Sequence, residues 1–538
     1  MSIFSHFSHV TLTGDQRTAL AALEGFMNDP EKQVFILRGY AGTGKTFLME
    51  GVAAWLQSLS RSVLFTAPTG RAAKVLQNRT GKTTHTIHRA IYSLESSSED
   101  TGATAFRLAD REAEPDAHWV FVVDEASMLG DNTDGESTGL SFGSGRLLND
   151  YIRYADFRKY PHTKLVLVGD NAQLPPVGMD FSPALSADYI ALEYRLQVAE
   201  AELRDVVRQE SDSDLLRSAT GLRSALAERK LTTRLPIKSG NGLRVVPAEK
   251  LTEKYLEFNP DKPSGQQVII AHSNTEVTAY NQLIRQHYFP GKAGVLAAGD
   301  ILVISQNAYH TTPSLHNGEI VRVESVGALE VRQIKAPRGR IYPCDVPFIR
   351  FGSDFIEGEF HFREATLSVR TADGGMARVQ TKVLENWLDC AEGTFPFAAQ
   401  HLLRRDAMDR FYQANKRLYA TDKEQFERLR SQFVAIDPWC NALRCRFGYA
   451  ITCHKAQGGE WKYVFVDMRA SMARDSEEFY RWVYTSITRA KRCVWLTFNS
   501  GEPKSERSAP VRVQPAANRN RSQAVVSRAL RNRGYEAL

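Results

Sequence analysis

Short apolar runs that end in glycine or polar residues recur through the first third of the chain and alternate with stretches of helical periodicity. Apolar runs bounded by turn residues are typical of buried strands, and strands that alternate with helices form parallel sheets. The pattern therefore predicts an α/β domain at the start of the chain. The predicted strands are residues 35–37, 62–67, 119–123 and 164–168, and the predicted helices include residues 17–27 and the segment after Lys45.

The same pattern returns later in the chain. Residues 222–230 predict a charged helix, and residues 267–274, 446–467 and 481–497 predict further strands and helices. Between them the periodicity changes to short strands, with a hairpin signal at Asn317-Gly318 and a charged helical stretch at 402–433. We therefore expect two α/β cores. The expected boundaries are 1–91 and 118–215 for the first core, 216–298 and 447–500 for the second, and 299–446 for an inserted β module with a helical appendage.

Four segments depart from this pattern. Residues 92–117 are polar around three consecutive serines, and an inserted hairpin and a surface loop are equally compatible with them. Residues 131–146 are rich in glycine, serine and aspartate and predict a mobile loop, while residues 203–209 predict the end of a helix. Residues 501–538 carry seven arginines and few apolar residues, which predicts a disordered basic tail.

Composition narrows the class of protein only modestly. The 538 residues are 43% hydrophobic and 24% charged, and the net charge of +6 permits a nucleic-acid partner without requiring one. No apolar run approaches the ~18–20 residues that span a bilayer, and residues 1–10 lack the features of a secretory signal. We expect a cytoplasmic protein without a membrane partner. The six cysteines are scattered, which favours reduced structural thiols.

The strongest chemical signal lies directly after the first predicted strand. Gly39, Gly44, Lys45 and Thr46 satisfy the phosphate-loop pattern G-x-x-x-x-G-K-[ST]. The glycines allow backbone N–H groups to approach phosphate oxygens, and the helix that begins at Lys45 adds its unpaired N–H groups. The loop predicts an ATP site, with Ala41, Gly42 and Thr43 also lining it, Lys45 on the outer phosphates, and the Thr46 hydroxyl on Mg²⁺.

Further polar residues follow the other predicted strands. Asp124 and Glu125 end an apolar strand, where Asp124 would hold Mg²⁺ and Glu125 would orient or deprotonate the attacking water. Gln173 at the end of a later strand suits sensing of the γ-phosphate, although a turn-stabilising amide is an alternative. Arg208 is a candidate for a positively charged side chain that contacts the nucleotide. Gln16 lies three residues after Thr13, which favours a helix-capping role over reading an adenine edge.

Seven blocks, in order, resemble the motifs of superfamily 1 helicases, in particular the 5′-to-3′ branch with RecD-like and Dda-type enzymes. The blocks are Gln16; residues 39–46, 67–71 and 124–127; Gly169-Asp170 with Gln173; and residues 452–460 and 484–489. The resemblance implies two RecA-like domains with ATP between them and single-stranded DNA across the top. It assigns Gln16 to adenine, Gln173 to the γ-phosphate, Arg208 and Arg489 to the opposite side of the cleft, and Glu460 to the ribose.

The resemblance also implies nucleic-acid contacts and further parts. Its DNA-binding positions are Pro68, Thr69, Arg71, Thr83, His88, Phe106, Asn274, Thr452, His454 and Gln457. Residues 92–117 resemble a strand-separating pin, and residues 299–446 an SH3-like domain that braces it. We therefore expect a monomeric 5′-to-3′ DNA helicase that acts on single strands and on junctions of single- and double-stranded DNA in replication, recombination or repair. A protein partner at the basic tail fits this picture, and a nucleotide-dependent binding switch without unwinding is the alternative.

Overall fold

The computed structural model describes residues 2–97, 104–111, 114, 116–133, 140–206, 213–339, 341, 343–371 and 375–498. The expected basic tail and Arg208 lie outside these described residues. Over the described part of the chain, helices that combine the length and the apolar character needed to cross a bilayer are absent.

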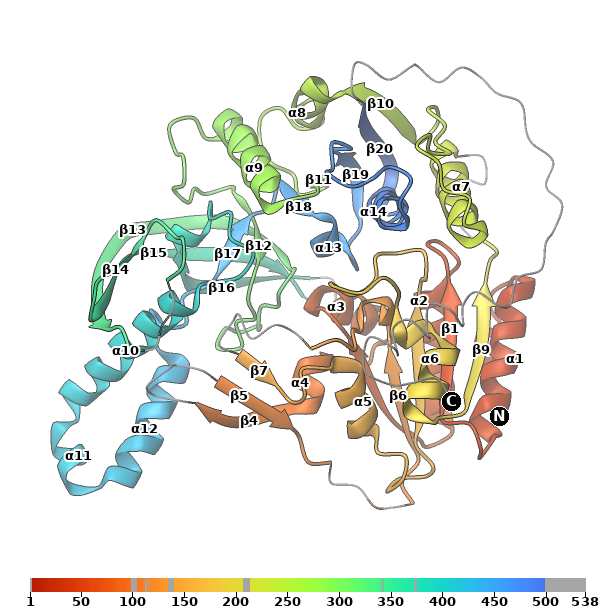
Figure 1. The fold of residues 1–538 in the computed structure, drawn as a ribbon, viewed down its shortest axis with the longest axis horizontal. Helices are drawn as coiled ribbons and strands as arrows, with labels where there is room; N and C mark the ends of the chain where they lie inside the picture. The colour runs from red at the N-terminus through yellow and green to blue at the C-terminus, as the bar shows by residue number, and fades with distance from the viewer. Residues whose placement is uncertain are drawn as a thin grey trace.

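The first core is a six-stranded parallel sheet with the order β3-β2-β6-β8-β1-β9, as the N-terminal sequence pattern predicts (Figure 1). Its strands are β1 (Val34–Gly39), β2 (Ser62–Ala67), β3 (Thr84–Thr86), β6 (Trp119–Val123), β8 (Lys164–Gly169) and β9 (Val198–Leu203). Its helices are α1 (Gly14–Asn28), α2 (Lys45–Ser58), α3 (Gly70–Thr80), α4 (Ile87–Ile91), α5 (Leu147–Ala155) and α6 (Ala187–Tyr194).

The helix predicted to end at residues 203–209 is absent from the described residues 198–206. Residues 198–203 form the strand β9, which pairs in parallel with β1 along the edge of the sheet. The sequence of β9, VAEAEL, alternates apolar and acidic residues, as an edge strand with one exposed face does. The prediction missed this period of two because alanine and glutamate also favour helices.

The second core is a five-stranded parallel sheet with the order β10-β20-β19-β11-β18. Its strands are β10 (Leu243–Pro247), β11 (Gln267–Ala271), β18 (Ala450–Thr452), β19 (Trp461–Val466) and β20 (Ala490–Phe498). Its helices are α7 (Asp214–Glu228), α8 (Leu251–Leu256), α9 (Asn274–Tyr288), α13 (Cys453–Ala456) and α14 (Glu477–Ile487). The two parallel sheets confirm the predicted α/β fold class with two RecA-like cores.

An antiparallel sheet interrupts the second core between β11 and β18. It contains β12 (Ile301–Ile304), β13 (Ile320–Pro337), β14 (Ile349–Phe351), β15 (Phe355–Arg370), β16 (Met376–Leu384) and β17 (Cys445–Phe447). The helical appendage is α10 (Phe397–Ala414), α11 (Lys416–Thr421) and α12 (Lys423–Ile436). The likeness of this insertion to an SH3 domain stays a prediction.

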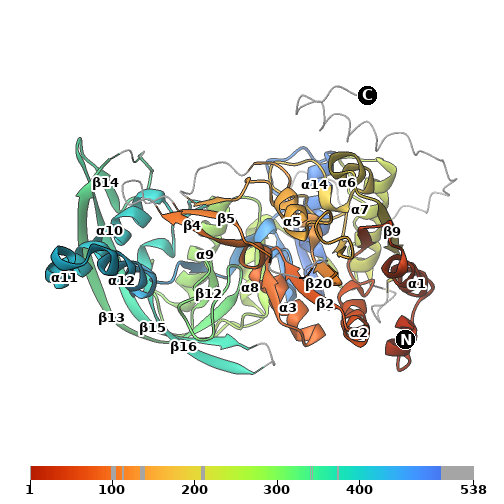
Figure 2. The same ribbon diagram turned by 90° about the horizontal axis from the view of Figure 1, so that it is seen from below.

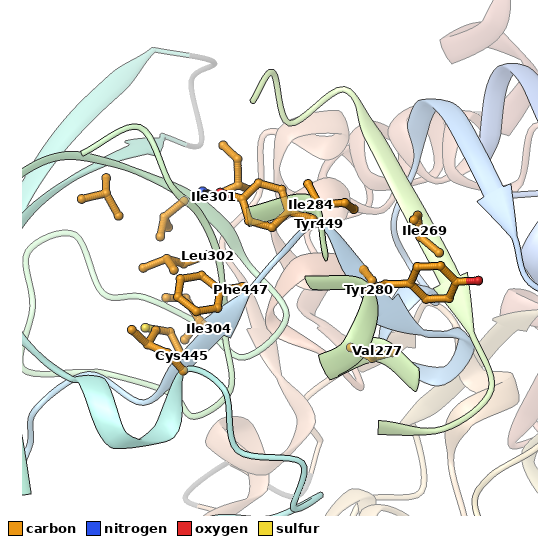
Figure 3. Close-up of a cluster of buried hydrophobic side chains, with 14 of the residues drawn as sticks. Ile269, Val277, Tyr280, Ile284, Ile301, Leu302, Ile304, Cys445, Phe447 and Tyr449 are labelled. Atoms are coloured by element: carbon orange, nitrogen blue, oxygen red, sulfur yellow. Dashed lines mark hydrogen bonds between the residues drawn. The ribbon is translucent and has the colours of Figure 1, made fainter. Parts of the chain in front are cut away.

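The insertion and the second core share one hydrophobic core (Figure 3). Ile269 of β11 and Ile284 of α9 belong to the same buried cluster as Leu302 of β12 and Phe447 of β17. The buried ion pair between Arg285 of α9 and Asp300, at 3.0 Å, lies at the same joint. Because apolar interiors pack densely, a shared core fixes the insertion rigidly to the second sheet.

Of the two alternatives for residues 92–117, the hairpin is confirmed by the pairing of its two described strands. β4 (Tyr92–Ser97) pairs with β5 (Thr104–Leu108) in antiparallel register. The predicted mobile loop at 131–146 contributes a third strand, β7 (Leu140–Phe142), which pairs in parallel with β5. The Phe106 ring stacks on Phe142 at 4.7 Å between centroids, a long-range contact that sequence composition does not signal. The hairpin extends from the first core toward the insertion (Figures 1 and 2).

Candidate functional site

The strand order brings the loops after β1, β6 and β8 to one edge of the first sheet. β8 lies between β1 and β6, and all three strands are parallel. Their carboxyl ends therefore face the same side, where ligands bind in open parallel sheets. The phosphate loop follows β1, Asp124 and Glu125 follow β6, and Asp170 and Gln173 follow β8. Residues separated by more than a hundred positions thus form one candidate nucleotide site.

The phosphate loop has the backbone conformation that its glycines permit. Gly42 and Gly44 have φ of 85° and 87°, a left-handed conformation that side chains rarely adopt. A Cβ at Gly39 would lie 2.9 Å from the Thr43 hydroxyl oxygen. The Lys45 ammonium donates to the carbonyl oxygens of Gly39 at 2.7 Å and Tyr40 at 3.1 Å. The lysine therefore already lies along the loop that would surround the phosphates.

Gln16 uses both ends of its side-chain amide within the protein. Its Oε1 accepts from the Thr13 backbone N–H at 3.1 Å, and the Thr13 hydroxyl accepts from the Gln16 N–H, which makes a capping box. Its Nε2 donates to the Thr43 carbonyl at 3.0 Å. The predicted capping of α1 is therefore present, and the same side chain ties α1 to the phosphate loop.

Asp124 and Glu125 form an acidic pair at the end of β6, in which Asp124 is buried and Glu125 is partly buried. Burial and the adjacent Glu125 carboxylate raise the pKa of Asp124 to about 7, which the Lys45 charge only partly opposes. Glu125 has a left-handed φ of 53°, and no partner for its buried Oε2 occurs among the described residues. An acidic pair without a full counter-charge fits a divalent cation, which prefers such oxygen ligands. Thr46 and Asp124 remain the proposed Mg²⁺ ligands.

The second core reaches across to the loop that follows β8. Within α14, Thr485 accepts from the Leu174 N–H at 3.0 Å, and Arg481 donates to the Gln173 carbonyl at 3.3 Å. Gln457, which the resemblance assigns to DNA, is buried and donates to the Leu174 carbonyl at 3.1 Å. The loop that carries the predicted γ-phosphate sensor is thus held by side chains of the second core.

Arg489 and Arg71 lie at the same junction between the cores. Arg489 is buried and donates to the Thr485 carbonyl at 3.0 Å and the Thr488 hydroxyl at 3.1 Å, both within its own core. Arg71 of α3 stacks on the Trp461 ring at 4.2 Å. Burial and the charge of Arg489 lower the pKa of Arg71 to about 10. Arg71, predicted to contact DNA, therefore packs between the two cores in this structure.

The first-core residues predicted to contact DNA lie next to the neighbouring strands β2 and β3. Pro68 and Thr69 come directly after β2, where the Thr69 hydroxyl caps α3. Thr83 precedes β3, and His88 of α4 contacts the Phe142 ring at 4.9 Å between centroids. Pro68, Thr69 and His88 lie at the carboxyl ends of β2 and β3, whereas Thr83 lies at the amino end of β3 and Phe106 belongs to β5 of the separate hairpin sheet. They lie on the hairpin side of the first core, away from β1.

The second-core residues predicted to contact DNA meet a narrow pocket at the joint with the insertion. Asn274 at the start of α9 and Thr452 at the end of β18 both line it, whereas His454 is exposed on α13. Arg446 of β17 and Lys455 of α13 are the cations of the lining. Burial and the charge of Arg446 lower the pKa of Lys455 to about 8. Arg446 is 6% exposed, and its Nε and Nη2 lack hydrogen-bond partners among the described residues.

Sequence reasoning missed three of the cations in these sites. Lys455 lies inside the recognised block 452–460, so a residue-by-residue reading of that block could have found it. Arg446 reaches the pocket only because β17 pairs with β12, which no local pattern signals. Arg223 of α7 lies over the Tyr40 ring of the phosphate loop at 3.8 Å, a contact that depends on how the cores pack. Glu460, predicted at the ribose, is exposed and pairs with Lys491 at 3.1 Å.

Two family models match the chain, and both fall on segments that build this site. An AAA domain model matches residues 11–136, which include the phosphate loop and the acidic pair. A model of the UvrD-like helicase C-terminal domain matches residues 447–497, which include Gln457, Tyr484 and Arg489.

Individual relatives are distant. The chain is 29% identical over 211 residues to an ATP-dependent RecD2 DNA helicase of Deinococcus radiodurans, which covers 39% of this chain and 24% of the relative. The chain thus spans about a quarter of that relative's length. It is 21% identical over 520 residues to an uncharacterized protein of Acanthamoeba polyphaga mimivirus, which covers 89% of this chain and 98% of that protein.

Among solved structures, a Pif1 helicase from Candida albicans aligns over 98% of this chain and 100% of that chain, with 15% identity and a TM-score of 0.45. The order of the seven sequence blocks, the two family models and the RecD2 match agree with one another. They confirm the resemblance of this chain to the superfamily 1 helicases of the RecD type.

Proposed function

We propose that the chain is an ATP-dependent DNA helicase that moves 5′-to-3′ along a single strand and separates the duplex ahead of it. The observation that carries the proposal is the contact of α14 and Gln457 of the second core with the nucleotide-site loops of the first. A nucleotide site whose loops are held by a second core can convert phosphate chemistry into relative motion of the two cores. The proposal includes a monomeric, cytoplasmic enzyme of replication, recombination or repair.

In this proposal, the first core binds ATP and directs the attacking water. Lys45 exchanges its bonds with the Gly39 and Tyr40 carbonyls for the outer phosphate oxygens of ATP. Glu125 accepts a proton from the attacking water, and Gln173 orients that water or the γ-phosphate. When bound through Thr46 and Asp124, Mg²⁺ neutralises phosphate charge. Asp124 must lose its proton to serve as such a ligand, which its raised pKa opposes below about pH 7.

Arg489 supplies the closing contact from the second core. Its present bonds, to Thr485 and Thr488, lie within its own core, so engagement of the γ-phosphate requires it to exchange them. An arginine that reaches a γ-phosphate in this way typically contributes ~10³–10⁵ in rate. Hydrolysis removes the charge that holds Arg489, and the cores then separate. Arg208 is proposed as the second such arginine.

The nucleic-acid path in this proposal passes Pro68, Thr69, Thr83 and His88 on the β2–β3 side of the first core and crosses to the pocket at Asn274 and Thr452. Arg446 and Lys455 add two cations to the second-core end of this path. Uncompensated cations in a pocket favour phosphodiester groups, whose backbone carries the sequence-independent part of the affinity. The hairpin with Phe106 lies at the other end, where we propose that the duplex is split.

The variant Lys45→Ala tests whether ATP hydrolysis can be removed while DNA binding is kept. Lys45 contacts loop carbonyls and none of the proposed DNA-binding residues. We expect Lys45→Ala to abolish hydrolysis while single-stranded DNA binding, measured by fluorescence anisotropy without nucleotide, stays within about twofold of the wild type. Wild-type turnover in this variant would overturn the assignment of the site. ATP hydrolysis that single-stranded DNA fails to stimulate would instead favour a binding switch.

A further inference from the structure

The Tyr484 hydroxyl of the second core joins two loops of the first core. It accepts from the Ala41 N–H of the phosphate loop at 3.1 Å and donates to Asp170 Oδ2 at 2.9 Å. Tyr484 is almost fully buried at the end of α14, so water does not compete for these bonds. One hydroxyl of the second core thereby bridges the loop after β1 and the loop after β8.

Asp170 organises the turn that carries the proposed γ-phosphate sensor. Its Oδ1 accepts from the Ala172 N–H at 2.9 Å, and its carbonyl accepts from the Gln173 N–H at 3.2 Å. The Gln173 side chain is buried, and its Oε1 has no hydrogen-bond partner among the described residues. The position of Gln173 therefore depends on the turn, and the turn depends on the group that holds Asp170.

The contacts form one continuous path from the phosphate loop to the sensor. The path runs from the Ala41 N–H through the Tyr484 hydroxyl to Asp170, and from Asp170 through the turn to Gln173. Burial and the Asp170 carboxylate raise the pKa of Tyr484 well above its ordinary value, so the hydroxyl keeps the proton that it donates. Tyr484 lies within the sequence block 484–489, but the resemblance assigns no role to its hydroxyl.

We propose that Tyr484 is a positioning residue for ATP hydrolysis, which couples the phosphate loop to the Gln173 turn through its hydroxyl. The inference rests on the proposed function, because it assigns Tyr484 a part in that reaction. Tyr484 does not touch the reacting atoms in this role. It sets the distance between the loop that binds the phosphates and the turn that carries the sensor. It also makes that distance depend on the position of the second core.

The variant Tyr484→Phe removes the hydroxyl and keeps the ring, and the same helix provides a matched control. Tyr480 lies one turn earlier on α14, and its hydroxyl likewise accepts a backbone N–H and donates to a backbone carbonyl, both of Thr232. These bonds stay within the second core. Tyr480→Phe therefore removes a comparable pair of buried hydrogen bonds without breaking a contact between the cores.

Two measurements on the full chain decide the proposal. Without nucleotide, we expect Tyr484→Phe to speed hydrogen exchange of the Ala41 amide about tenfold or more, because the amide loses the Tyr484 hydroxyl that accepts its hydrogen bond at 3.1 Å. With saturating single-stranded DNA, we expect kcat for ATP to fall about ten- to hundredfold, as expected for a lost hydrogen bond to a charged group, while KM stays within about twofold. Tyr480→Phe should leave both quantities near the wild-type values.

The outcomes separate this inference from the proposed function. Equal kinetics for Tyr484→Phe and Tyr480→Phe would overturn the positioning role, even if Ala41 exchange is faster. Unchanged Ala41 exchange would show that the bridge does not form in solution, and would overturn it as well. A wild-type chain that hydrolyses no ATP in the presence of DNA would overturn the proposed function, and with it the positioning role, whatever the exchange rate.

Discussion

Replacement of Asp124 by asparagine is expected to stabilise the chain while it removes a proposed Mg²⁺ ligand. The Asp124 carboxyl is buried beside Glu125, and its pKa is raised to about 7 from the ordinary value near 3.9. This raised pKa corresponds to about 4 kcal/mol of unfavourable free energy for the charged form at pH 8. Asparagine carries no charge and keeps an oxygen that can accept from the Glu125 N–H, as Asp124 Oδ1 does at 2.9 Å.

The sign of the pH dependence follows from the direction of the shift. Between about pH 4 and pH 7 the folded chain holds a proton on Asp124 that the unfolded chain has released, so the free energy of unfolding falls as the pH rises through this window. The stability gain from Asp124→Asn should therefore be small at pH 4.5 and approach a few kcal/mol at pH 8. The same linkage predicts that Mg²⁺-nucleotide binding strengthens as the pH rises through about 7.

Urea unfolding of the nucleotide-free chain at pH 4.5 and pH 8 measures this effect, with amide exchange in β6 used to follow the first core. Asp110→Asn serves as a control, since Asp110 is 77% exposed and pairs with Arg107 at the surface. A variant Asp124→Asn that is less stable than the wild type at pH 8 would refute the reasoning. A gain of the same size at both pH values would refute it too, because the gain would then not come from charge.

Two further predictions concern the proposed nucleic-acid path. Arg446→Gln should weaken single-stranded DNA binding and lower the slope of log affinity against log salt by about one. It should not lower the stability of the free chain, because it removes a buried charge that lacks hydrogen-bond partners at Nε and Nη2 among the described residues. A loss of stability would instead assign Arg446 to packing against Trp387, which it overlies at 4.6 Å. Phe106→Ala should preserve DNA-stimulated ATP hydrolysis but reduce strand separation, and unchanged unwinding rates would place the pin elsewhere.

The sequence predicted those parts of the site whose chemistry is local. The phosphate loop, Asp124 with Glu125, and the capping box at Gln16 each depend on residues a few positions apart, and local backbone geometry follows from such patterns. The alternation of strands and helices likewise predicted both parallel sheets. Hydrophobic periodicity reflects which face of a helix or strand is buried. It can therefore be recognised in the sequence without knowing which other element covers that face.

Contacts between distant segments could not be predicted in the same way. Gln457 and Arg71 match motif positions associated with DNA, yet Gln457 bonds the β8 loop and Arg71 stacks on Trp461. The pairing of β7 with β5, across a segment rich in glycine and serine, also depends on tertiary packing of Phe142. Such contacts are selected by the relative placement of whole elements, which a single sequence does not encode in any local pattern.

Strand displacement with duplexes that carry either a 5′ or a 3′ single-stranded overhang tests the central claim most directly. The proposed function predicts that the wild-type chain with ATP and Mg²⁺ releases the labelled strand from the 5′-overhang duplex. It predicts no release from the 3′-overhang duplex, and none with Lys45→Ala on either. Release from the 3′-overhang duplex alone would contradict the proposed polarity, and absence of ATP-dependent release from both duplexes would contradict the assignment as a helicase.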